Sequence, residues 1–329
     1  MPAEWEPHAA TWLTWPRPDG ISFPGCYEVV PPVLARLVRL ITEGEAVHIN
    51  IWDTELERLA KRALEAEGVP KADVHFHPFP AYEPWCRDHG PLFVVRTDGK
   101  RAIVNWSYNA WGGKYPPFDL DDGIPAKVAN ALGLPLFEPE MILEGGSIDV
   151  NGAGQLLTTE SCLLHPNRNP RLAKRDIESR IRDFLGIEKI TWLGEGIEGD
   201  DTDGHVDDLS RFVDADTVVT VVEPSPTDLN HAPLKANCEQ LGQAFNVIEL
   251  PMPERVKIDG QRLPASYANF YISNAHVIVP TYRDANDERA LGLLREAFPG
   301  RTVTGLDSMD LIWGLGSFHC LTQQEPAGN

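Results

Sequence analysis

The sequence has few cysteines, no long apolar run and no excess of basic residues, and each of these absences excludes a class of protein. Its five cysteines are an odd number and are well separated along the chain, so neither a disulfide framework nor a zinc site of the CxxC type is supported. We therefore expect a reducing compartment. The apolar stretches, such as Val218–Val222, are far too short to span a bilayer, which argues against a membrane protein.

The shortage of basic side chains gives the chain a formal net charge of -20. Such a surface repels phosphate backbones, so we expect no nucleic-acid partner, whereas small amines and guanidines would be attracted to it. The alternative to such ligand binding is that the acidic surface only aids solubility. The opening residues, Met1–Glu6, are acidic and lack the apolar core of a signal peptide. We therefore expect a cytoplasmic protein.

Pairs of short β-rich segments joined by tight turns recur along the chain. The turns contain Asp, Asn and Gly, and the flanking segments are rich in β-branched residues, as in β-hairpins. The predicted hairpins cover residues 91–104, 147–157, 210–219 and 270–279. Helical periodicity is found at Arg171–Leu185, Leu234–Phe245 and Ala285–Phe298. Short strands such as Ile190–Trp192 and Val247–Leu250 come after these helices.

The repeated unit is therefore a hairpin, a helix and a strand, at intervals of roughly 50 to 65 residues. The N-terminal stretch adds a helix at Val30–Leu40 and a strand at Val47–Ile49. The last strand, around Cys320, is predicted to pair with Thr11–Trp15 and to close a ring. No low-complexity linker divides the chain, so we predict an α/β fold with a single domain over residues 1–329.

Polar residues open the predicted hairpins. They are Asp88, Glu144–Gly146, His205–Asp207, Asn269 and His319–Cys320. If the modules circle an axis, all these openings point towards its centre. Residues that are far apart in the sequence would then form one pocket.

Cys320 is the candidate nucleophile of this pocket. The small residues Gly316 and Ser317 precede it, and the polar run Thr322–Gln324 after it is unusual for a core strand. A thiol becomes a good nucleophile only when its pKa falls or when a base or cation lies nearby. The other cysteines lack such a context, and we expect them to be inert packing residues.

His205 and two carboxylates are the candidate partners of this thiol. His205 lies two residues before Asp207, so in an extended segment both side chains point to the same face. Asp88 opens a strand, and Trp85 could cover the face of a planar cation whose edge meets a carboxylate. Other interpretations stay open: the segment around His205 could be a solvated acidic loop or a metal loop, and Arg87 could form only a structural ion pair.

Together these residues predict the hydrolysis of a guanidinium group. Asp88 and Asp207 would accept hydrogen bonds from its nitrogens and fix it in place. The Cys320 thiolate would attack the carbon while protonated His205 gives its proton to the departing ammonia. Neutral His205 would then activate a water that releases a ureido product. The carboxylates would raise the pKa of the thiol and the bound cation would lower it, so we expect the substrate to assist thiolate formation.

Further motifs accompany these residues in a fixed order. They are Met1–His8 with Thr11–Trp12 and Trp15–Pro16, Trp85–Pro91, Tyr108–Tyr115, Leu143–Ser147, Asn167–Pro170, Thr202–Asp207 and His319–Gln324. In these motifs the chain resembles, over nearly its whole length, the agmatine deiminase family of the group that includes the Porphyromonas-type peptidylarginine deiminases. Two departures occur: Leu315, Ser317 and Phe318 interrupt a glycine-rich run that usually ends in Asn-Ile-His, and Glu325–Pro326 follow the last motif.

The resemblance implies a pentein fold, a β/α-propeller of five ββαβ-type modules around a pseudo-fivefold axis. It implies hydrolysis of agmatine to N-carbamoylputrescine and ammonia, a step of putrescine and polyamine biosynthesis, by a homodimer with no cofactor and no metal ion. The matching residues are the nucleophile Cys320, the acid/base His205, the guanidinium-binding Asp88 and Asp207, and the pocket-lining Trp85 and Trp111.

The distal amine of agmatine would need an acidic partner, for which Glu144 and the Asp119–Asp122 cluster are the candidates. Free arginine would instead need a basic residue for its carboxylate, and peptidyl-arginine would need an open cleft. Two other classes of protein also fit the residues. One is a non-catalytic guanidine or polyamine binder, and the other is a metal-dependent hydrolase that uses His205.

Overall fold

The computed structural model describes residues 1–328 and contains five β-sheets of three or four strands with the same topology. In each sheet an antiparallel pair of strands is followed by a strand parallel to the second. At least one helix lies in the chain between the two parallel strands. A parallel pair needs such a crossover because a tight turn cannot join it. Each sheet with its helix is therefore one ββαβ module.

Four modules follow one another along the chain. Their strands are β4 (Leu92–Val95), β5 (Arg101–Val104) and β6 (Leu136–Phe137); β7 (Ile148–Val150), β8 (Gln155–Thr159) and β9 (Lys189–Leu193); β10 (Ser210–Phe212), β11 (Thr217–Val222) and β12 (Asn246–Pro251); and β15 (Tyr271–Ile272), β16 (His276–Thr281) and β17 (Thr302–Asp307). Their main helices are α6 (Ile124–Leu132), α8 (Lys174–Leu185), α9 (His231–Leu241) and α10 (Asp287–Ala297). The four predicted hairpins are confirmed. The three helices predicted in these modules are present, with their ends shifted by a few residues.

The fifth module joins the two ends of the chain. It consists of β18 (Thr322–Pro326), β1 (His8–Thr14), β2 (Ala46–Asn50) and β3 (Val74–His77), with α1 (Val30–Ile41) and α2 (Thr54–Ala66) between strands. Thr11 pairs with Gln324, which confirms the predicted closure by the last strand. The prediction that Cys320 lies within this strand was wrong. Cys320 lies in the one-turn helix α11 (Phe318–Leu321) just before it, where the Thr322 hydroxyl donates to the Phe318 carbonyl at 2.8 Å.

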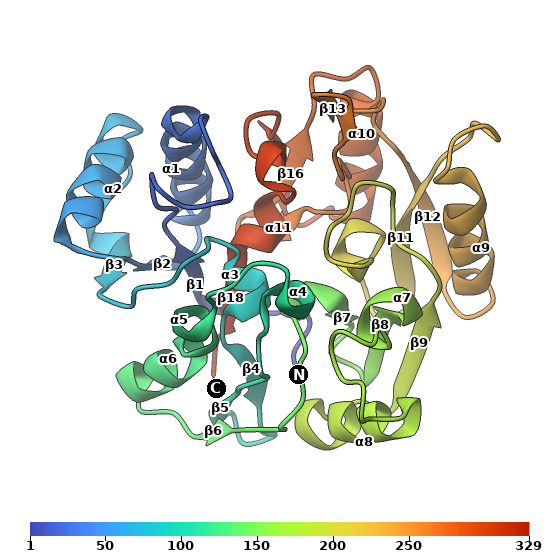
Figure 1. Cartoon of the computed structure of the whole chain (residues 1–329), viewed down its shortest axis with the longest axis horizontal. Helices are drawn as coiled ribbons and strands as arrows, with labels where there is room; N and C mark the ends of the chain where they lie inside the picture. The colour runs from blue at the N-terminus through green and yellow to red at the C-terminus, as the bar shows by residue number, and fades with distance from the viewer. Residues whose placement is uncertain (329) are drawn as a thin grey trace.

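Short helical turns stand at the start of the modules and meet at the centre of the molecule. They are α3 (Cys86–His89) before β4, the 3₁₀ turns η3 (Gly145–Ser147) and η4 (Val206–Asp208) before β7 and β10, and α11 before β18. α11 contacts α3, α3 contacts η3, and η3 contacts η4. Figure 1 shows the five sheets around a common centre where α3 and α11 lie. This arrangement agrees with the pentein plan and brings the predicted openings together.

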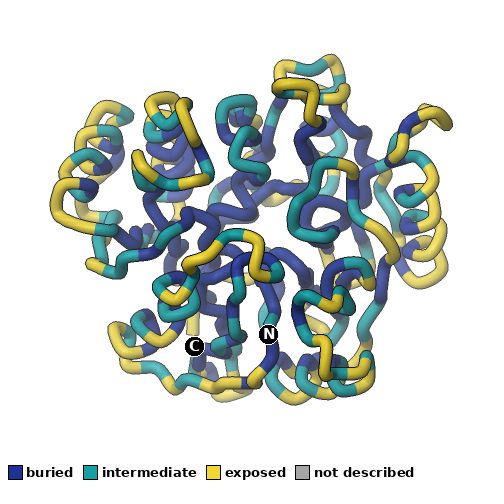
Figure 2. Tube along the Cα trace, viewed as in Figure 1, coloured by how far each residue is buried: buried dark blue, intermediate teal, exposed yellow. Residues whose placement is uncertain are grey.

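The apolar core lies between the central strands and the helices that cover them. Figure 2 shows buried backbone through the middle of the molecule and exposed residues mainly on the outer helices and loops. β11 reads as a nearly continuous apolar run, as expected for a strand that is covered on both faces. In α1, Leu37 is fully buried, which contributes about 1.5–3 kcal/mol relative to an exposed side chain.

Short elements complete the described chain. They are α4 (Ala110–Gly113), α5 (Asp119–Asp122), α7 (Glu160–Leu163), the hairpin of β13 (Lys257–Ile258) and β14 (Gln261–Arg262), and 3₁₀ turns at Tyr27–Val29, Lys71–Asp73 and Ile312–Gly314. All five cysteines are free. Over residues 1–328, no helix has both the length and the apolar character needed to cross a bilayer.

Candidate active site

Cys320 is anchored at the centre of the molecule by Asn269, which lies two residues before β15. The Asn269 side-chain amide donates to Cys320 Sγ at 3.0 Å. Its Oδ1 accepts the backbone N–H groups of His319 at 3.1 Å and Cys320 at 3.4 Å. One amide side chain therefore fixes both the thiol and the turn that carries it.

His205 lies beside both predicted carboxylates. Its Nδ1 is 3.6 Å from Asp88 Oδ1 and 4.0 Å from Asp207 Oδ1. Asp207 Oδ2 is in turn 3.7 Å from Cys320 Sγ. The residue before His205, Gly204, has a φ of 104°, which favours glycine and lets the chain turn the imidazole inwards. The thiol, the imidazole and the two carboxylates thus come together as predicted.

The absence of a side chain at Gly146 lets these groups approach one another. The backbone N–H of Gly146 donates to Asp88 Oδ1 at 3.0 Å. A Cβ on Gly146 would lie 2.7 Å from His205 Nδ1, 2.8 Å from Asp88 Oδ1 and 3.0 Å from Asp207 Oδ2. Gly146 therefore occupies the point where the imidazole and both carboxylates meet, and no larger residue fits there without displacing them.

Asp88 is held through both of its oxygens, whereas Asp207 is held through one. Trp111 Nε1 donates to Asp88 Oδ2 at 2.8 Å, and His319 Nδ1 lies 2.7 Å from Asp207 Oδ2. Trp111 has a φ of 53° and a ψ of 47°, a left-handed conformation that is costly for a bulky residue and is often kept for function. Asp207 Oδ1 has no hydrogen-bond partner within residues 1–328, so it is free to accept one from a ligand.

The second nitrogen of His319 extends this network to the N-terminus. His319 Nε2 lies 2.8 Å from Glu4 Oε2, and Glu4 also pairs with Arg87 at 3.1 Å and Arg211 at 3.0 Å. Both nitrogens of His319 lie within hydrogen-bond distance of carboxylates, so this ring links Asp207 to Glu4. Arg87 additionally donates to Gln324 at 2.8 Å, and these buried contacts favour the structural ion pair over a role in ligand binding.

Burial and charge set the protonation of the site. Burial, together with the charges of Asp207 and Glu144, raises the pKa of Asp88 to about 6, although His205 opposes this shift. Burial and the nearby carboxylates, Asp207 first, raise the pKa of Cys320 well above its usual value. Burial lowers the pKa of His205, but the charge of Asp88 and the contact with Cys162 outweigh it and raise the pKa well above its usual value. Both shifts favour a neutral Cys320 thiol and a protonated His205 imidazole in the absence of substrate.

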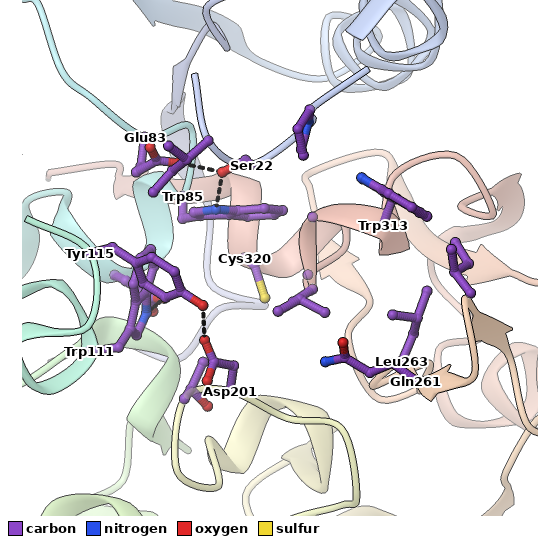
Figure 3. A pocket seen from close by; sticks show the side chains of 18 of the residues that line it. Ser22, Glu83, Trp85, Trp111, Tyr115, Asp201, Gln261, Leu263, Trp313 and Cys320 are labelled. Carbon is purple, nitrogen blue, oxygen red and sulfur yellow. Dashed lines mark hydrogen bonds between the residues drawn. The ribbon is translucent and has the colours of Figure 1, made fainter. Parts of the chain in front are cut away.

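A cavity of about 410 Å³ opens above the thiol. Cys320, Asp88, Trp85 and Trp111 line it, as predicted for the nucleophile, one carboxylate and the two aromatic residues. Figure 3 shows Cys320 between Trp85 and Asp201, with Trp111 and Tyr115 on one side and Trp313 on the other. The remaining carboxylates in the lining belong to Glu83, Asp201 and Asp259.

Comparisons with known proteins agree with this geometry. The family model of the Porphyromonas-type peptidyl-arginine deiminases matches residues 1–326. The chain belongs to this family. A Selenomonas ruminantium protein named "Putative agmatine deiminase" is 36% identical over 358 residues, which cover 99% of this chain and 95% of that protein.

Solved structures of the family have the same fold. A cysteine-to-serine variant of the C. jejuni agmatine deiminase with substrate bound has a TM-score of 0.92 and 31% identity, and the match covers 100% of this chain and 96% of the other. An agmatine deiminase of Enterococcus faecalis has a TM-score of 0.91 and 31% identity, with 99% and 95% coverage.

The predicted role of Glu144 at the distal amine does not agree with its position in this deiminase-family chain. Its side chain is completely buried, its Oε1 accepts from Arg168 Nε at 2.6 Å, and it does not line the cavity. The Asp119–Asp122 cluster does not line the cavity either. Asp121 accepts the backbone N–H of Tyr82 at 2.7 Å, so its carboxylate is used in the protein itself.

Sequence reasoning missed several residues of the site. It placed Asn269 and His319 at the centre but gave them no role, and it did not identify Glu4, Tyr115 or Asp201. The available signal for His319 was its position directly before Cys320. Nothing in the sequence indicates that Glu4 reaches a residue 315 positions away.

Proposed function

We propose that this chain is an agmatine deiminase, a hydrolase that converts agmatine and water to N-carbamoylputrescine and ammonia. The observation that carries the proposal is the convergence of Cys320, His205, Asp88 and Asp207 at one end of an acidic cavity, which Cys320 and Asp88 line while His205 and Asp207 lie directly behind them. The names of the relatives and of the substrate-bound structure support the same activity. We further propose that the site belongs to one domain that spans the chain.

The two carboxylates hold the guanidinium group. Asp88 and Asp207 flank His205, Asp207 Oδ2 lies 3.7 Å from Cys320 Sγ, and Asp207 Oδ1 has no partner of its own within residues 1–328. A planar guanidinium donates through several N–H groups, so two carboxylates can fix both its position and its plane. Trp85 and Trp111 supply aromatic walls, which attract cations. This fixation places the guanidinium carbon within reach of the thiol.

The substrate's charge activates the nucleophile. In the free enzyme burial and the carboxylates keep the thiol protonated. A bound guanidinium cation offsets those negative charges and stabilises the thiolate. Sγ then forms a bond to the guanidinium carbon, His205 gives its proton to one nitrogen, and the C–N bond to that nitrogen breaks to release ammonia. The product of this half-reaction is an amidino group on Cys320.

Water completes the reaction. Neutral His205 takes a proton from a water molecule that attacks the amidino carbon. The tetrahedral adduct collapses, the C–S bond breaks, and the sulfur recovers a proton. The released product carries a ureido group, and the enzyme returns to its starting state.

The cavity favours a substrate with a second positive charge. Besides Asp88, the lining contains the carboxylates of Glu83, Asp201 and Asp259, and within the described chain it contains no Lys, Arg or His side chain. The nearby Lys114 lies 2.9 Å from Asp203 and 3.6 Å from Asp201 Oδ1, and a distal ammonium would share Asp201 with it. Asp201, which accepts the Tyr115 hydroxyl and faces the space next to Cys320 (Figure 3), is the proposed partner of the distal ammonium. Free arginine would bring its carboxylate into this negative field.

Turnover of three guanidines tests the proposal. Ammonia release should be fastest with agmatine and much slower with arginine and with a peptidyl-arginine. Cys320→Ala should release no ammonia from agmatine but should still bind it in a calorimetric titration. Preference for arginine would overturn the substrate assignment. Full activity of Cys320→Ala would overturn the mechanism, and binding of agmatine by the unaltered protein without any turnover would favour a non-catalytic guanidine binder.

A further inference from the structure

A group of metal-ligand atoms that includes a ring nitrogen of His205 lies behind the residues that line the cavity. Glu144, Cys162 and His205 each contribute one donor atom, and these three atoms all lie within 4.8 Å of one another. All three side chains are buried. Nowhere else in residues 1–328 do three His, Cys, Asp or Glu side chains gather in this way.

In the described chain, three nitrogen and oxygen atoms of this cluster lack hydrogen-bond partners outside it. Neither ring nitrogen of His205 nor Oε2 of Glu144 has a hydrogen-bond partner within residues 1–328. A buried polar atom without a partner costs about 1–3 kcal/mol. Unsatisfied atoms in one enclosed group therefore indicate a place for a ligand that accepts electron pairs from all of them.

The start of α7 holds Cys162 beside His205. Thr159 Oγ1 accepts the backbone N–H of Cys162 at 3.2 Å and caps this short helix. The same hydroxyl donates to the carbonyl oxygen of Gly204 at 2.5 Å. One side chain therefore ties the turn that carries the thiol to the residue directly before His205.

Arg168 holds Glu144 in a matching way. Its Nε donates to Glu144 Oε1 at 2.6 Å and its Nη2 donates to the carbonyl oxygen of Thr202 at 2.9 Å. These bonds orient Glu144 and leave its Oε2 free. The positive charge of Arg168 is balanced by Asp203, whose Oδ2 lies 2.6 Å from Nη1, so the cluster can accept a cation.

We propose that Glu144, Cys162 and His205 form a binding site for one Zn²⁺ ion, and that its occupation inhibits the enzyme. A thiolate, an imidazole and a carboxylate are the ligands that zinc takes in proteins, and three of them leave one position of the tetrahedron for water. The proton of the Cys162 thiol and the extra proton of the His205 imidazolium both leave to solvent when the metal binds. The set contains too few oxygens for Ca²⁺ or Mg²⁺, so it selects softer transition metal ions.

Inhibition follows because His205 would be both the acid/base of the reaction and a ligand of the zinc ion. A ring nitrogen that is bound to zinc has no lone pair to accept a proton, so the imidazole cannot cycle between its acid and base forms. The effect on turnover rests on the proposed function, whereas metal binding itself rests only on the three donors.

Spectroscopic titration with Co²⁺ in place of Zn²⁺ tests the site without turnover. The protein is Cys320→Ala, which removes the active-site thiol as an alternative ligand. We expect one equivalent of Co²⁺ to bind with a thiolate-to-cobalt charge-transfer band, which Zn²⁺ displaces. The band should be lost on adding Cys162→Ser or Cys162→Ala and kept on adding Cys238→Ser, a control whose sulfur lies 3.9 Å from Glu249 Oε1 on the surface. Thermal unfolding of each variant checks that it is folded.

A band that persists in folded Cys320→Ala/Cys162→Ser would overturn the proposal, as would the absence of cobalt and zinc binding in Cys320→Ala. In the enzyme with Cys320 intact, Cys162→Ser should raise the Zn²⁺ concentration for half-inhibition by at least about 10-fold, and Mg²⁺ should not inhibit either protein. Equal sensitivity of both proteins to Zn²⁺ would refute the inhibitory role. Lack of turnover with agmatine would contradict the proposed function but would leave the cobalt result intact.

Discussion

Replacing Gly146 with alanine tests whether the imidazole and the two carboxylates act as one constellation. The added Cβ would lie 2.7 Å from His205 Nδ1, whereas ordinary Cβ contacts begin at 3.4 Å. His205 would therefore have to retreat by about 0.7 Å, the difference between these distances, and Asp88 at 2.8 Å by nearly as much. The φ of Gly146 is not in the left-handed region, so the backbone itself accepts alanine.

A misplacement of about 1 Å in a catalytic site can cost on the order of 10²-fold in rate. We therefore expect kcat/KM for ammonia release from agmatine to fall by roughly that factor, or about 2.7 kcal/mol in transition-state stabilisation. Overpacking should lower the free energy of unfolding by only about 1–3 kcal/mol, so the variant should still fold. Steady-state kinetics and thermal unfolding measure the two effects separately.

Gly292→Ala in α10 is the matched control, because a Cβ there meets no atom within 4 Å. It should keep full activity and gain about 0.5–1 kcal/mol of stability, since glycine destabilises a helix interior by that amount relative to alanine. A folded Gly146→Ala enzyme with unchanged kcat/KM would refute the reasoning. It would mean that these groups do not pack around Gly146 in the working enzyme.

Three further predictions concern other parts of the molecule. His319→Gln can keep only one of the two carboxylate contacts. The loss of a hydrogen bond to a charged group, about 1.5–3 kcal/mol, should leave Asp207 less well positioned and lower kcat/KM about 10- to 100-fold. Unchanged kinetics would exclude a positioning role for His319. Asp201→Asn should raise KM for agmatine roughly tenfold, or about 1.4 kcal/mol of charge attraction, but should barely affect butylguanidine, and an equal rise for both would show that Asp201 does not bind the distal ammonium. Burial and two neighbouring imidazoles lower the pKa of His48 to about 4, so the unfolded chain takes up this proton first and the free energy of unfolding should fall as pH drops from about 6.5 to 4. Chemical denaturation at several pH values should show a shallower fall for His48→Asn, and parallel curves would contradict the assignment.

The repeated modules could be predicted because their signals are local. Turn residues between β-branched segments define each hairpin, and a helical period marks α8 and α10. The pairing of the last strand with β1 followed from the repeat and not from either strand alone. The conformation of Cys320 could not be predicted in this way, because its one-turn helix depends on Asn269, which anchors the turn from another module.

In the candidate site, too, features with local sequence signals could be predicted and those that depend on distant contacts could not. The convergence of Cys320, His205, Asp88 and Asp207 could be predicted because their motifs recur at the openings of the repeated modules and together suit one ligand. Glu144 was assigned to the far end of the substrate because the sequence shows that it carries a carboxylate. The sequence does not show that this carboxylate is buried and paired with Arg168. Contacts between distant segments decide such roles, and a single sequence does not contain them.

The central claim is that Cys320 forms a covalent bond to the guanidinium carbon of the substrate. Mass spectrometry of the enzyme quenched by acid during turnover of agmatine tests it most directly. We predict an added amidino group on the peptide that contains Cys320 and no such addition in Cys320→Ala. An amidino group on another residue, or quenched active enzyme that never carries one, would contradict the account.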